Sequence, residues 1–132
     1  MLTPEDVVLL NNCAKVVMFV SIDAYGKLNE QTRIGSDWNQ IEKFVDNILN
    51  NTNYVLGIET VLHKKSWRGL VDLLLWINEK NEIRPINWSV HPLIVPQILS
   101  IKNLNLDESK ELMDMLTNYN IPDSKQIYRM LQ

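Results

Sequence analysis

The chain has 132 residues, with 13 lysines and arginines against 16 aspartates and glutamates, so its formal net charge at pH 7 is −3. This acidic balance argues against a dedicated nucleic-acid-binding protein, whose binding face is normally basic. A single cysteine excludes an internal disulfide, and 45% of the residues are apolar, which is enough to build a hydrophobic core. We therefore expect residues 1–132 to form one domain that needs no metal or disulfide cross-link.

No segment predicts export or insertion into a membrane. The residues after Met1 are acidic, whereas a signal peptide begins with a positive region. The most apolar run, residues 13–22, contains Lys15 and is about half the ~20 residues that a membrane-spanning helix needs. We expect a cytoplasmic protein.

The amino-terminal segment begins with a strong helix-start signal. Thr3 is placed to cap the first free backbone N–H groups, and Pro4 suits the first helical position. The helix is predicted to continue to a stop at Gly26, whose backbone suits the closing residue of a helix. An alternative stays open, because residues 16–22 are rich in β-branched side chains and could form the first strand of a β-hairpin over residues 16–34.

Three further helices are predicted in the middle of the chain. Residues 37–50 carry a clear apolar stripe after a possible cap at Asp37. A helix over residues 54–62 is expected from its apolar spacing, which involves Tyr54, Val55, Ile58, Val61 and Leu62. A helix from Ser66 to about residue 80 is apolar nearly all round, which is typical of the buried centre of a bundle.

Proline interrupts the pattern in the last third of the chain. Residues 82–95 are expected to form an ordered connection, because three prolines rule out a continuous helix there: Pro85, Pro92 and Pro96. A short helix over residues 96–103 follows, and then two helices capped by Asp107 and Asp123. The predicted fold is an all-α compact bundle of about six helices with a proline-interrupted connection. The alternative is an α+β fold with an amino-terminal β-hairpin at residues 16–34.

The sequence contains no recognisable catalytic or metal-binding set. Two histidines and one cysteine are too few for the usual zinc sites, and the four glycines stand alone instead of forming a phosphate-binding loop. No serine lies in a nucleophile-elbow sequence. We therefore predict no metal, no cofactor and no enzymatic activity. The remaining enzymatic alternative is an unrecognised site near His91.

Two features predict a protein-binding surface. Acidic residues gather near the carboxyl terminus, where they oppose only Lys110: Asp107, Glu108, Glu111 and Asp114. Such a face attracts a basic partner and raises its association rate by ~10–10³-fold. Tryptophan is enriched at binding hot spots, so an exposed ring at Trp76 or Trp88 would serve as an anchor for the partner.

These observations favour a small, non-enzymatic protein-binding protein. The leading hypothesis is an inhibitor, an immunity protein or a bacterial or phage accessory factor that docks on a basic partner, such as a toxin or nuclease, through the acidic helical face. The first alternative is a nucleic-acid-binding regulator with a helix-turn-helix within Thr60–Ile77. The second alternative is the enzyme with a site near His91.

Overall fold

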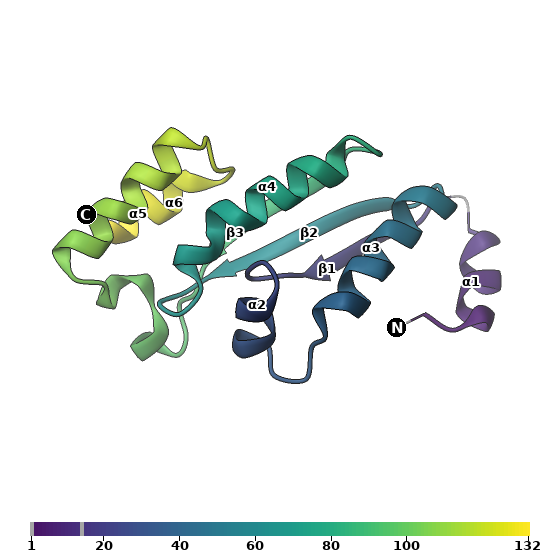
Figure 1. The fold of residues 1–132 in the computed structure, drawn as a ribbon, viewed down its shortest axis with the longest axis horizontal. Coiled ribbons are helices and arrows are strands. Elements are labelled where there is room, and N and C mark those ends of the chain that lie inside the picture. Colours follow the sequence, from purple (N-terminus) through teal and green to yellow (C-terminus); the bar gives the residue numbers. More distant parts are fainter. Residues whose placement is uncertain (1, 14) are drawn as a thin grey trace.

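The computed structural model describes residues 2–13 and 15–132 and contains a three-stranded, fully parallel sheet with the strand order β1-β2-β3 (Figure 1). The strands are β1 (Val17–Ser21), β2 (Val55–Leu62) and β3 (Ile86–Pro92). The chain therefore has an α+β fold, and the prediction of an all-α bundle is wrong.

Helices connect the parallel strands, as they must, because such strands need a long crossover connection. From β1 to β2 the chain passes through α2 (Lys27–Thr32) and α3 (Trp38–Asn51). From β2 to β3 it passes through a 3₁₀ turn (Trp67–Gly69) and α4 (Leu70–Asn81). Helix α1 (Pro4–Asn11) precedes the sheet; two 3₁₀ turns (Gln97–Leu99 and Ile101–Asn103), α5 (Leu106–Asn118) and α6 (Ser124–Leu131) follow it.

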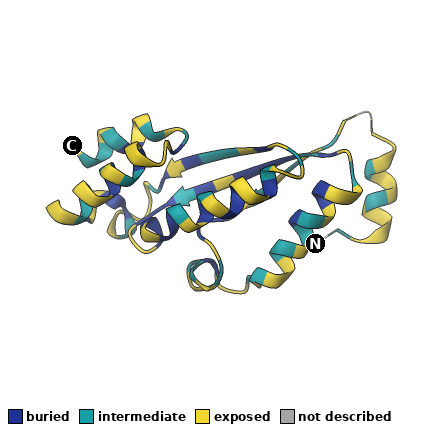
Figure 2. Ribbon diagram, turned by 45° about the horizontal axis from the view of Figure 1, so that its top comes forward, coloured by how far each residue is buried: buried dark blue, intermediate teal, exposed yellow. Residues whose placement is uncertain are grey.

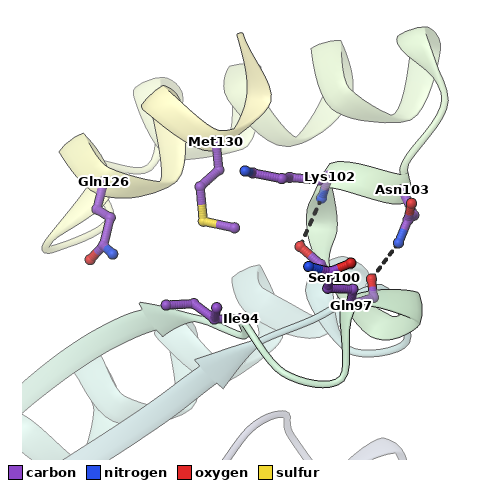
Figure 3. Close-up of a pocket in the computed structure, with 7 residues that line it drawn as sticks. All are labelled: Ile94, Gln97, Ser100, Lys102, Asn103, Gln126 and Met130. Carbon is purple, nitrogen blue, oxygen red and sulfur yellow. Dashed lines mark hydrogen bonds between the residues drawn. The ribbon is translucent and has the colours of Figure 1, made fainter.

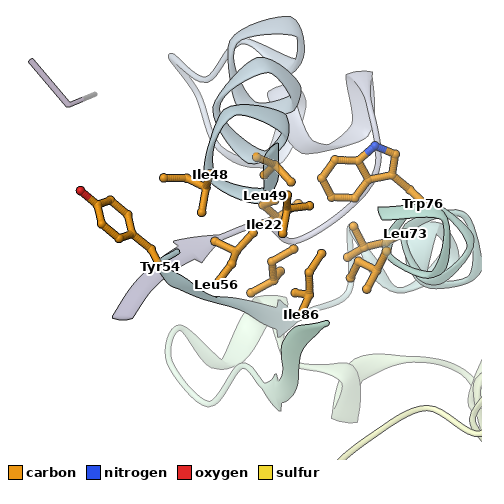
Figure 4. Close-up of a cluster of buried hydrophobic side chains, with 11 residues drawn as sticks. Ile22, Ile48, Leu49, Tyr54, Leu56, Leu73, Trp76 and Ile86 are labelled. Carbon is orange, nitrogen blue, oxygen red and sulfur yellow. The ribbon is translucent and has the colours of Figure 1, made fainter. Parts of the chain in front are cut away.

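The helices cover only one face of the sheet. The strand residues of both hydrophobic clusters lie at even-numbered positions. Those of the first cluster pack against α3 and α4 (Figure 4), and those of the second pack against the carboxyl-terminal helices. The odd-numbered residues point to the opposite face, which we call the open face. They are exposed or half-buried with the exception of Gly57, which lies under the ring of Phe19. This arrangement is unusual, because parallel sheets are normally covered on both faces.

Two hydrophobic clusters hold the described residues together. The first cluster joins α3 and α4 to the sheet and includes Ile22, Val45, Ile48, Leu56, Ile58 and Leu73 (Figure 4). The second joins the carboxyl ends of β2 and β3 to α5 and α6 and includes Leu62, Trp67, Val90, Leu112 and Ile127. Helix α1 has no buried residue and lies at the amino-terminal end of the molecule (Figure 2).

The long amino-terminal helix is not formed. Helix α1 ends at Asn11, and residues 17–21 form β1 instead. The β-branched residues there favour an extended backbone because their side chains crowd a helical turn. The alternative prediction, an α+β fold with a β-hairpin at residues 16–34, is correct in its fold class. Its hairpin is not formed, because residues 27–32 are helical and β1 pairs with β2.

Two other segments predicted as a helix and a connection are strands. Residues 54–62 contain β2, the central strand, whose apolar residues lie on both faces of the sheet and so lose the alternation typical of a half-buried strand. Residues 82–95 contain β3. Pro92 ends β3 at the free edge of the sheet, where a missing N–H group removes no hydrogen bond from the ladder.

The remaining helices follow the sequence signals closely. Helices α3, α4, α5 and α6 lie within a few residues of their predicted ranges, and Thr3 caps α1 by accepting a hydrogen bond from Asp6 N–H. Helix α5 is capped by Asn105 rather than Asp107. Asp123 makes no cap; its carboxylate accepts a hydrogen bond from Val90 N–H instead (3.3 Å). No helix in the described part of the chain is long and apolar enough to cross a membrane.

Candidate protein-docking site

A shallow groove runs between α4 and α5 on the side of the molecule that carries the predicted acidic face. Its volume is about 530 Å³, and it is lined by Val71, Asp107, Lys110, Glu111, Asp114, Met115, Asn118 and Tyr119. Val71 comes from α4, whereas the other residues belong to α5 or follow it directly. The structure thus adds an apolar floor to the charged residues predicted from the sequence. We call this feature the acidic groove.

The four predicted acidic residues differ in what their carboxylates contact. Glu108 completes the cap of α5, and both carboxylate oxygens of Glu111 accept hydrogen bonds from Arg68 (2.9 and 3.0 Å). Arg68 also lies 3.6 Å from Glu108 and stacks over the ring of Trp67. Among the described residues, neither Asp107 nor Asp114 forms an ion pair. These two exposed carboxylates are therefore the free acidic groups of the groove, and Lys110, which also lines it, offsets part of their charge.

Trp76 is part of the core and cannot be the exposed anchor expected from the sequence. Only 5% of its surface is exposed, and its indole N–H donates a hydrogen bond to Glu42 (2.9 Å). The ring packs 5.0 Å from that of Trp38, which in turn lies 5.0 Å from the ring of Tyr25. Trp76 is buried because it lies on the side of α4 that packs against α3, where Trp38 and Glu42 contact its ring and its N–H group (Figure 4).

Trp88 is half-buried on β3 and contacts both hydrophobic clusters. Its indole N–H donates a hydrogen bond to the hydroxyl of Thr60 (2.9 Å), a buried group that itself donates to Ile22 C=O (2.6 Å). Trp88 therefore links β3 to β2 and β1 on the helical face. Neither predicted tryptophan lies in the acidic groove, whose aromatic residue is Tyr119 instead.

The two alternative functions gain no support from the geometry. His91 is exposed on the open face near the end of β3, and no hydrogen bond or ion pair of the described residues involves its side chain. Residues 60–77 do not form two helices, because they contain the end of β2, a 3₁₀ turn and most of α4. A helix-turn-helix is therefore not present in that region.

A buried ionic cluster, which the sequence patterns did not reveal, closes the carboxyl ends of β1 and β2. The carboxylate of Asp23 lies 2.9 Å from Arg33 Nε and accepts a hydrogen bond from Val61 N–H (3.0 Å). Asn29 accepts the backbone N–H of Asp23 (2.9 Å). Because both carboxylate oxygens are already engaged, this cluster fastens the loop after β1 to β2.

His63 lies beside this cluster and is largely buried. Its Nδ1 accepts a hydrogen bond from Lys65 N–H (3.2 Å). Burial lowers the pKa of His63 below the ordinary 6.5, although the negative charge of Asp23 acts in the opposite direction. The imidazole is consequently held in its neutral form as part of the turn between β2 and α4.

A second cavity, of about 390 Å³, lies between the segment after β3 and α6 (Figure 3). It is lined by Ile94, Gln97, Ser100, Lys102, Asn103, Gln126 and Met130. Two of its polar groups are engaged with the local backbone: Ser100 accepts Lys102 N–H (3.2 Å), and Asn103 donates to Gln97 C=O. Lys102 is its single charged residue, so the cavity contains no acid–base pair.

The comparisons with known proteins leave the function to be argued from the chain itself. No family model, curated protein or solved structure matches it. Within residues 2–13 and 15–132, no group of three histidine, cysteine, aspartate or glutamate side chains is arranged to hold a metal ion.

Proposed function

We propose that this chain is a non-enzymatic protein-binding protein that docks on a basic segment of its partner through the acidic groove. The observation that carries this proposal is the combination of an apolar floor with two unpaired carboxylates at its rim. Val71, Met115 and Tyr119 offer apolar contact area, while Asp107 and Asp114 are exposed and available to lysine or arginine. Such a surface fits an amphipathic segment that carries both apolar and basic side chains.

The ion pairs around the groove leave two of its carboxylates free to attract a basic partner. Arg68 holds Glu111 in place, and its positive charge is neutralised by Glu111 and by the neighbouring Glu108. A basic partner would therefore meet Asp107 and Asp114 first, and these exposed charges would act mainly on the association rate and its salt dependence. Inhibitors and immunity proteins of basic enzymes are the class of protein that needs such a surface.

The proposal is tested with a synthetic amphipathic helix made of lysine and leucine as the probe. Amide chemical shifts in NMR spectra should change at Val71, Met115 and Tyr119, and binding should weaken as salt is added. The double variant Asp107→Asn/Asp114→Asn should lose about 5–30-fold in affinity, because each exposed ion pair contributes ~0.5–1 kcal/mol.

The matched control is the double variant Glu5→Gln/Glu82→Gln, which changes the net charge equally but at exposed positions outside the groove. It should bind the probe as the unaltered chain does. Equal weakening in both variants would show a nonspecific charge effect, and shifts confined to another surface would contradict the proposed docking site.

A further inference from the structure

Strand β1 forms one edge of the sheet, and its outward backbone groups have no partner in the described residues. Ile22 N–H donates to Glu59 C=O (3.0 Å), so the even-numbered residues of β1 direct their backbone groups toward β2. Val17, Phe19 and Ser21 therefore direct theirs away from the sheet. No turn, cap or side-chain hydrogen bond in this part of the structure uses them.

The opposite edge, formed by β3, is protected. Its outward groups belong to even-numbered residues: Ile86 N–H donates to the side chain of Asn81 (2.8 Å), and Val90 N–H donates to Asp123 (3.3 Å). Pro92 has no N–H group to offer. Natural sheets block their free edges with such devices to prevent unwanted strand pairing. Among the described residues, Trp88 N–H is the one outward N–H group of β3 without a partner, so this edge is largely blocked, whereas the edge of β1 is open along its whole length.

The side chains around β1 are also suited to a neighbouring strand. Phe19 and Val17 are 66% and 45% exposed, and no residue between 16 and 22 is charged. A groove of about 300 Å³ follows this edge on the helical side and includes the half-buried Ile41 and Phe44 of α3. An added strand would thus meet apolar side chains on both of its faces.

We propose that β1 pairs antiparallel with β1 of a second copy of this chain, across a two-fold axis at Phe19, so that the three strands of each copy form one continuous sheet. The two residue numbers in each opposing pair then sum to 38. Phe19 faces Phe19, and Val17 faces Ser21. These are the residues whose backbone groups point outward, so each of these odd-numbered pairs exchanges both of its hydrogen bonds.

The apolar side chains are complementary in the same register. On the helical face, Met18 of one copy lies opposite Val20 of the other, beside Ile41 and Phe44 of the groove. Parallel pairing of two copies would set Lys15 of one copy beside Lys15 of the other, whereas antiparallel pairing places these two like charges at opposite ends of the paired strands. The antiparallel arrangement is thus favoured by the backbone, by the packing and by the separation of like charges.

Sedimentation velocity tests this proposal through the mass of the particle. One chain has a mass of 15.4 kDa, so a dimer has 2 × 15.4 = 30.8 kDa. The variant Phe19→Lys places two like charges at the two-fold axis and should sediment as a monomer. The matched control Asn87→Lys adds the same charge on the open face of β3 and should remain a dimer.

Two further variants test for the same dimer interface in case Phe19→Lys disturbs the fold. Ser21→Pro removes only an outward N–H group, so it should give a monomer with an unchanged circular dichroism spectrum. In a Cys13→Ser background, Phe19→Cys should be cross-linked to a dimer by a mild oxidant, because opposing residues lie about 5.5 Å apart at Cα. Asn87→Cys in the same background should not.

Three results would overturn the proposal. One is a monomer at about 0.1 mM protein, where even a weak dimer would be populated. Another is a dimer that persists in both Phe19→Lys and Ser21→Pro, which would place the interface elsewhere. The third is protection of the outward N–H groups of β1 from hydrogen exchange only after a different protein is added. That result would show that β1 pairs with a strand of the added protein.

Discussion

Replacing Arg84 by Met should destabilise the chain through the carboxyl end of α3. The guanidinium of Arg84 donates hydrogen bonds to three backbone carbonyls in the stretch that leads from α3 to β2: Ile48, Thr52 and Tyr54. The last carbonyls of a helix lack helical partners. Arg84 supplies donors to this stretch, in which the Ile48 carbonyl also accepts a hydrogen bond from the hydroxyl of Thr52 (2.7 Å). The methionine keeps an apolar stem and removes only the donors.

The size of the effect follows from the number of bonds and their exposure. A hydrogen bond from a charged donor contributes ~1.5–3 kcal/mol, so three of them set an upper bound near 5–9 kcal/mol. Arg84 is only half-buried, and water can replace part of what it supplies. We expect the free energy of unfolding to fall by about 2–4 kcal/mol, and Tm by roughly 8–16 °C.

Urea denaturation followed by circular dichroism measures this loss. Arg84→Lys should show an intermediate loss, because one ammonium group cannot reach three diverging carbonyls as a planar guanidinium does. The loss should not vary between pH 5 and pH 8, since arginine stays charged throughout. A loss below about 0.5 kcal/mol in Arg84→Met, or full stability in Arg84→Lys, would refute the reasoning.

Two other substitutions test the loops around the sheet. Burial lowers the pKa of His63 in the folded chain, although the charge of Asp23 acts in the opposite direction. As the pH falls, the imidazole is therefore protonated in the unfolded chain before it is protonated in the folded chain. The contribution of His63 to stability should be full above pH 6.5 and should decline below it until the lower pKa of the folded chain is passed. His63→Gln should remove this decline in denaturation curves, and His91→Gln should keep it. Gly69→Ala should cost about 1–2 kcal/mol, because its new methyl would lie 2.6 Å from Leu28 Cδ2. Leu28→Ala should relieve much of that cost in a double-mutant cycle, and strictly additive losses would contradict the proposed clash.

The helices were predictable because their signals are local. The apolar stripe over residues 37–50 and the nearly apolar stretch over residues 66–80 correspond to α3 and α4. The same holds for the caps at Thr3 and Asp37, each of which accepts a backbone hydrogen bond within the next three residues. Such patterns depend only on residues a few positions apart, which a sequence shows directly.

The strands were missed because their stability comes from distant residues. The segment 54–62 has apolar residues at helical spacing, yet it becomes β2 since it lies between two other strands. A central parallel strand has apolar residues on both sides, so its pattern does not separate it from a buried helix. The burial of Trp76 likewise depends on where α4 packs, whereas the acidic residues of α5 were recognised because their clustering is local.

The strand order has a consequence for how the nascent chain folds on the ribosome. Val17 pairs with Val55, so 55 − 17 = 38 residues must be synthesised after Val17 before its partner exists. At ~5–20 residues per second this delay lasts about 2–8 s. During that interval β1 is an uncharged, apolar segment whose backbone N–H and C=O groups have no strand partner on either side. Chaperones protect segments of this kind from aggregation. β3, by contrast, emerges when β2 is already available as a template.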